Sequence, residues 1–195
     1  MTRSTIDPMT ALVVIDLQKS VMQLPTPHSS ADIVDRAAEL AREFRRHSLP
    51  VVLVTAIAGA PGRTESRPST APKPPDAAEL APGLEAQSSD HLVRKQRWGA
   101  FYQTDLDEHL RELGVTQIVL TGIATSFGVE STARAAHEHG YNVTLAIDAM
   151  TDMSAEAHRN SIERIFPRLG ETGTTAEIVA LLDTRPALDR RQGRC

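Results

Sequence analysis

Cysteine is almost absent from this chain of 195 residues, because the single one, Cys195, is the last residue. A lone thiol cannot form a disulfide bond within the chain. It follows the charged segment DRRQGRC, and we expect residues 184–195 to form a mobile tail. A thiol on such a tail is poorly placed to act as a nucleophile. The sequence therefore predicts neither a disulfide framework nor catalysis by Cys195.

Long apolar runs and an excess of positive charge are also missing. No apolar run approaches the roughly 20 residues that span a bilayer, and the N-terminal MTRSTIDPMT lacks the basic and then apolar order of a signal peptide. The formal net charge of −4 offers no broad basic surface for a phosphate backbone. We therefore expect a cytoplasmic protein that binds neither membranes nor nucleic acid.

Motifs for phosphates and metals are absent as well. The segment LQKSVMQ follows the first apolar run, where a nucleotide-binding flavodoxin-like domain would need a glycine-rich loop. The HEH at 137–139 places its histidines two positions apart, and such residues face different directions on a helix. We expect no bound metal and no cofactor.

Short apolar runs rich in Val, Ile and Leu alternate with helical patterns. We predict strands at 11–16, 50–55, 116–122 and 141–148, a weaker one at 91–95, and helices at 31–48, 104–114, 124–140, 155–166 and 174–183. Glycines can end two of these helices. Strands alternating with helices favour a three-layer α/β/α sandwich with a mostly parallel, Rossmann-like sheet. The length and the 41% hydrophobic content suit a single domain over residues 1–195.

One long segment interrupts this alternation. Six of the twelve prolines lie between Gly59 and Gly83, which predicts a long loop over residues 57–88. In a compact domain a loop of this length usually closes over a site or binds a ligand, or else is disordered.

The ends of the predicted strands carry the candidate chemistry, because ligands of open parallel sheets bind beyond the carboxyl ends of the strands. Asp16 ends the first run, with Gln18 close behind it, and Lys95 ends the run at 91–95. Trp98, Phe101 and Tyr102 follow Lys95; we expect the first two to line a pocket and interpret Tyr102 as a core residue.

A third strand end begins the segment GIATSFGVESTARAA at 122–136. Free backbone N–H groups at a helix start favour an anion or a developing oxyanion. Thr125 and Ser126 offer hydroxyl groups here, although such residues at a helix start most often cap the backbone. We interpret Asp148 and Asp152 in the same way, as caps of the helix predicted at 155–166.

In this order, the segments LVVIDLQ, KQRWGAFYQTDL, LTGIATSFGVESTARAAHEHGYNV, DAMTD and FPRLG resemble the isochorismatase-like hydrolases, a superfamily that includes nicotinamidases and other cysteine hydrolases. The resemblance implies that Asp16 is the catalytic acid or base, that Lys95 is the catalytic lysine, and that Gly128 stands where most members have a nucleophilic cysteine. It also implies a cis peptide bond at Ile123–Ala124 and a homo-oligomer. The metal motif of nicotinamidases is missing, because TAIAGAPG at 55–62 contains no ligand.

True isochorismatases also have glycine at this place and cleave a vinyl ether without a covalent enzyme intermediate. The resemblance therefore implies a hydrolase of a small molecule that needs no cysteine. The alternative is a catalytically silent binding protein that keeps the pocket. In either case the candidate substrate-binding residues are Gln18, Trp98, Phe101, Ala124, Thr125 and Phe127.

Overall fold

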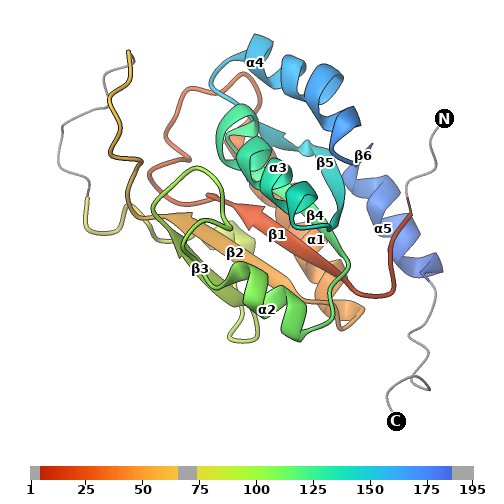
Figure 1. Cartoon of the computed structure of the whole chain (residues 1–195). Helices are drawn as coiled ribbons and strands as arrows, with labels where there is room; N and C mark the ends of the chain where they lie inside the picture. Colours follow the sequence, from red (N-terminus) through yellow and green to blue (C-terminus); the bar gives the residue numbers. More distant parts are fainter. Residues whose placement is uncertain (1–4, 66–73, 186–195) are drawn as a thin grey trace.

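The computed structural model describes residues 5–65 and 74–185 (Figure 1). Cys195, most of the predicted tail and the middle of the predicted 57–88 loop lie outside the described residues. Within this part of the chain no helix is both long and apolar enough to cross a membrane.

Six parallel strands form one sheet in the order β3-β2-β1-β4-β5-β6. Continuous runs of buried Val, Ile and Leu build its centre, as expected for a sheet covered on both faces. The strands are β1 Thr10–Ile15, β2 Val51–Ala56, β3 His91–Lys95, β4 Gln117–Ile123, β5 Asn142–Thr151 and β6 Glu171–Gly173. The first five confirm the predicted strands, whereas the three-residue β6 was not predicted.

Helices cover both faces of the sheet, which confirms the three-layer α/β/α sandwich (Figure 1). Apolar residues of α1 and α5 pack on one face, and those of α2, α3 and the turns after α4 pack on the other. The helices are α1 Ser30–Arg46, α2 Leu106–Glu112, α3 Glu130–Glu138, α4 Ala155–Asn160 and α5 Thr175–Thr184. Gly114 and Gly140 follow α2 and α3 with φ angles of 67° and 86°, so the predicted glycine caps are confirmed.

The strand order fixes where a site can form. The chain moves outward from β1 through β2 to β3 on one side, and from β4 to β6 on the other. The direction therefore switches between β1 and β4, and the crevice at such a switch point is where open α/β sheets bind ligands. Asp16 follows β1 at this crevice, and a π-helical turn, Thr125–Val129, follows β4 and leads into α3.

The segment before β3 lies against the turn after β1. A short 3₁₀ helix spans Pro82–Leu84, and an isolated antiparallel bridge joins Leu80 to Gln18. The backbone N–H groups of Lys19 and Ser20 donate to the carbonyl oxygens of Glu79 and Ala77. The described part of the predicted long loop is thus hydrogen-bonded to the edge of the site.

Candidate active site

An ion pair between Asp16 and Lys95 lies at the carboxyl end of the sheet. Asp16 directly follows β1 with a φ of 54°, and Lys95 is the last residue of β3. Lys95 Nζ lies 2.8 Å from Asp16 Oδ2, and the two side chains are 1% and 11% exposed. Lys95 Nζ also donates to the carbonyl oxygen of Trp98 at 2.5 Å. The sequence predicted these two strand ends as the chemical centre, and the sheet brings them into contact across β2.

Gly128 faces this ion pair from the π-helical turn. A Cβ at Gly128 would lie 3.1 Å from Lys95 Nζ and 3.2 Å from Asp16 Oδ2. These separations are those of hydrogen-bonded heavy atoms. It would also lie 2.9 Å from Ile15 Cγ2, closer than real Cβ atoms approach a carbon. A glycine at this position brings the turn close to the carboxylate and the ammonium and places no side chain against them.

The backbone before the turn has the form that the resemblance implied. The peptide bond Ile123–Ala124 is cis. Both residues line a cavity together with Phe127 and Gly128.

This cavity has a volume of about 300 Å³ and opens above the ion pair. Its charged lining residues are Asp16, Lys95 and Arg97, so the lining carries one negative and two positive groups. The other lining residues are Val21, Leu24, Ala56, Ala58, Gly59, Trp98, Ile123, Ala124, Phe127, Gly128 and Met153. The net positive lining favours a substrate with negative charge.

Aromatic and apolar side chains form the outer wall. Trp98 packs edge-on against Phe127 with ring centroids 4.8 Å apart. Trp98 and Met153 remain 54% and 43% exposed. A substrate with an apolar body can cover these surfaces while a polar end reaches the ion pair.

Three predicted binding residues do not belong to the lining of this cavity. The Gln18 side-chain amide donates to the Ala56 carbonyl oxygen and accepts from the Ala56 N–H, so it ties the turn after β1 to the end of β2. Phe101 is buried and packs against the ring of Tyr141. Thr125 is fully buried. The structure gives all three a clear packing role. The ring of Tyr102, which we interpreted as core, is 57% exposed, so that interpretation is wrong.

The hydroxyl groups near Gly128 are engaged with polar side chains. Ser126 donates its hydroxyl to Asp152 Oδ2 at 2.8 Å, and its N–H donates to the same oxygen at 2.7 Å. Thr125 Oγ1 lies 2.8 Å from His158 Nδ1. Burial, and then the neighbouring His28, lower the pKa of His158, which keeps its imidazole neutral at pH 7. Because the Thr125 hydroxyl is buried next to this imidazole, it has no access to a substrate.

The interpretation of Asp148 and Asp152 as caps of the turn into α4 fits only Asp152, whose Oδ1 accepts from the Ser154 N–H in that turn. Ser154 caps that helix by accepting from the Ala157 N–H. Asp148 instead accepts from the N–H and hydroxyl of Thr175 at the start of α5, so it binds a different helix start from the one its position in sequence indicates. Asp152 also accepts from the N–H of Ser126, so it joins the turn into α4 to the start of the π-helical turn.

One group of side chains in the described residues has the spacing of metal ligands, and it lies outside this cavity. One potential ligand atom from each of Glu43, His47 and Asp183 falls within 4.8 Å of the others. The Arg46 guanidinium, however, lies 2.6 Å from a carboxylate oxygen of both Glu43 and Asp183. Arg46 therefore already supplies the positive charge that a metal would bring.

Sequence reasoning missed Val21, Leu24, Arg97 and Met153 as parts of the cavity wall. They come from turns and loops after three different strands. Of these four residues, only Arg97 could have been predicted from the sequence, because it lies two residues beyond the predicted catalytic lysine.

Comparisons with known proteins show what the whole chain is similar to. The isochorismatase domain model matches residues 10–177. The uncharacterized isochorismatase family protein YecD of Escherichia coli O157:H7 is 43% identical over 183 residues, which cover 89% of this chain and 96% of that protein. A probable isochorismatase of Pseudomonas chlororaphis is 29% identical over 184 residues, 90% of this chain and 87% of the relative. The solved structure of an isochorismatase family protein from Burkholderia thailandensis is 44% identical and superposes with a TM-score of 0.88 over 92% of this chain and 98% of that one.

Proposed function

Because the chain belongs to the isochorismatase family, we propose that it hydrolyses a small anionic molecule without a covalent enzyme intermediate. The observation that carries this proposal is that Gly128 lines the cavity together with Asp16 and Lys95 and brings no side chain that could act as a nucleophile. A nucleophilic route needs a side chain at this place. Proton transfer from a positioned carboxyl group does not.

The chemistry that fits this pair is cleavage of a vinyl ether. Lys95 Nζ, at 2.8 Å, gives a proton to Asp16 Oδ2, which passes it to the terminal alkene carbon. The pair thereby loses one proton and becomes negative, while the substrate becomes a positive oxocarbenium ion. Water then adds to the cationic carbon and returns its proton to the pair, and the resulting hemiketal releases an alcohol and a ketone. For an enolpyruvyl ether the ketone is pyruvate.

Arg97 is the candidate anchor for a carboxylate of the substrate. Its guanidinium lies 5.8 Å from the centre of the Tyr102 ring and donates to the Gln96 carbonyl oxygen. Within the described residues no carboxylate forms an ion pair with it. A guanidinium can bind a carboxylate through two parallel hydrogen bonds, which would orient the substrate over the ion pair.

The name of one relative suggests the first substrate to test. The Pseudomonas chlororaphis protein is described as a probable isochorismatase, and isochorismate combines a vinyl ether with carboxylate groups. We propose to measure pyruvate released from isochorismate by the wild type and by Asp16→Asn. Asp32→Asn, an exposed carboxylate on α1, is the control. Pyruvate from the wild type and the control but not from Asp16→Asn supports the proposal; equal release from all three contradicts it.

A second pair of variants separates a loss of substrate binding from a loss of folding. Arg97→Gln removes the anchor without breaking the ion pair, and Arg94→Gln removes an exposed arginine from β3 that does not line the cavity. We expect Arg97→Gln to raise KM by at least about tenfold, because a charged hydrogen bond contributes about 1.5–3 kcal/mol. Arg94→Gln should leave KM unchanged. Isochorismate that binds through Arg97 but gives no pyruvate would instead indicate a silent binding protein.

A further inference from the structure

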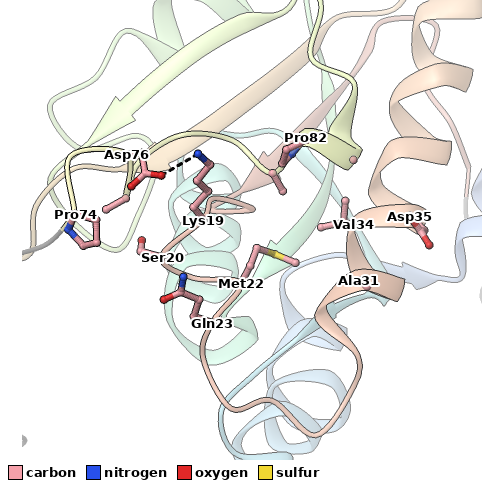
Figure 2. A pocket seen from close by; sticks show the side chains of 13 residues that line it. Lys19, Ser20, Met22, Gln23, Ala31, Val34, Asp35, Pro74, Asp76 and Pro82 are labelled. Carbon is pink, nitrogen blue, oxygen red and sulfur yellow. Dashed lines mark hydrogen bonds and ion pairs between the residues drawn. The ribbon is translucent and has the colours of Figure 1, made fainter.

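Figure 2 shows a second cavity, which has a volume of about 490 Å³. Three segments surround it: the turn after β1, the beginning of α1, and residues 74–83. Its volume falls within the range of small-molecule sites. The residues around it are Lys19, Ser20, Met22, Gln23, Ala31, Val34, Asp35, Pro74, Asp76, Ala77, Ala81, Pro82 and Gly83.

The two cavities share one wall. In the turn after β1, Val21 and Leu24 line the catalytic cavity, whereas Met22 and Gln23 line the second one. The Gln18 carbonyl oxygen accepts from the N–H groups of Val21 and Met22, which fixes the turn between the two spaces. The second cavity is therefore a separate compartment with none of the catalytic groups in its lining.

The inner surface of this compartment is apolar. Met22 extends toward Val34 in Figure 2, and Pro82 lies on the opposite side of the space. Gly83 helps to shape it, because a Cβ there would lie 2.8 Å from Val34 Cγ1. An apolar ring or short alkyl chain is the shape of molecule that removes these surfaces from water.

The charges around the compartment are predominantly negative. Lys19 Nζ lies 2.9 Å from Asp76 Oδ2 and 2.7 Å from Glu79 Oε2 (Figure 2 shows the first of these contacts). Hydrogen bonds to Glu79 and then Asp76 raise the pKa of Lys19, so this ammonium is already matched by two carboxylates. Asp35 adds a further exposed carboxylate, with which no described residue forms a hydrogen bond or an ion pair.

From the apolar lining and the surplus of carboxylates, we propose that this compartment binds a small organic cation, an amine with an apolar ring or chain. The apolar body lies between Met22, Val34 and Pro82. The ammonium group lies toward Asp35 at the start of α1. This binding does not depend on the catalytic proposal, because none of its groups takes part in that chemistry.

Phenethylamine and 2-phenylethanol are suitable probes, since they share the ring and differ in the charged group. Each is titrated into the isotope-labelled full chain while backbone amide chemical shifts are recorded. We expect saturable shifts centred on Met22, Ala31 and Gly83, and a Kd for the amine that is about two- to fivefold lower than for the alcohol, as for an exposed charge pair. Shifts centred on Gly128, or no saturable shifts, would overturn the proposal.

Matched variants locate the binding and its charge preference. Ala31→Leu fills the compartment from an exposed position early in α1, and Ala155→Leu makes the same change at the start of α4. Binding should be lost only in the first. Asp35→Asn should make the two probes equal, whereas Asp32→Asn, on the same helix but outside the lining, should keep the preference for the amine. If the members of either pair behave alike, the compartment is not the binding site.

Discussion

Replacing Gly128 by alanine tests whether substrate reacts beside the ion pair, on the side that Gly128 faces. The added methyl carbon would lie 3.1 Å from Lys95 Nζ and 3.2 Å from Asp16 Oδ2. A substrate atom that hydrogen-bonds to both groups would be crowded by this methyl group. We expect kcat/KM to fall at least about 100-fold, because displacing a reacting atom by about 1 Å is enough for such a loss.

The same substitution should leave the protein folded. Contact with Ile15 Cγ2 at 2.9 Å is an overpacking that costs about 1–3 kcal/mol. Alanine offsets about 0.5–1 kcal/mol of this, because glycine loses more backbone freedom on folding. The positive φ angles among the described glycines fall at Gly114, Gly122 and Gly140, so Gly128 adds no strain of that kind. The net decrease in the free energy of unfolding is about 0–2.5 kcal/mol.

Gly83→Ala is the matched control for this experiment. Its Cβ would meet Val34 Cγ1 at 2.8 Å, a similar contact that involves neither Asp16 nor Lys95, and Gly83 does not line the catalytic cavity. Urea unfolding and the pyruvate assay are performed on both variants. Similar losses of stability with activity lost only in Gly128→Ala support the assignment. A folded Gly128→Ala variant with the kcat/KM of the wild type would refute it.

Three further predictions concern stability. Asp90→Asn should lower the free energy of unfolding by about 3 kcal/mol in urea titrations, because it breaks the two-bond contact with the largely buried Arg45; a loss below about 1 kcal/mol would contradict the pairing. Gly122→Ala should destabilise by at least about 3 kcal/mol, or fail to fold, since φ is 125° and its Cβ would lie 2.0 Å from a β1 carbonyl oxygen; a wild-type melting temperature would contradict this. Burial lowers the pKa of His158, so stability should fall as the pH drops below about 6.5, where the unfolded chain binds this proton first. Unfolding at about pH 7.5 and 5.5 should show a smaller decrease for His158→Gln than for the wild type or the exposed His137→Gln.

The sequence predicted β1, β2, β4 and β5 well because each contains a run of buried, mostly apolar residues, whereas β3, in which buried and exposed residues alternate, gave the weaker signal. It missed β6, which has only three residues, ETG, and owes its strand character to pairing with Thr144–Ala146 of β5. Pairing with a neighbouring strand leaves no hydrophobic pattern in the three residues of β6 themselves.

The same contrast holds for the site. Asp16 and Lys95 could be predicted because strand ends of a parallel sheet meet at one edge. Gly128 required the resemblance to a family, since a missing side chain carries no signal of its own. Arg97 and Met153 face the cavity because of the way in which separate loops pack together. The sequence of each loop alone does not predict this packing.

The split between strand ends and loops has a consequence for how this protein can change. The ion pair is set by the spacing of β1, β2 and β3, whereas Val21, Leu24, Trp98 and Met153 lie on connecting segments. Connecting segments accept substitutions and insertions at little cost to the core. Copies of this protein that differ only in their turns would therefore present altered cavity walls around an unaltered Asp16–Lys95 ion pair.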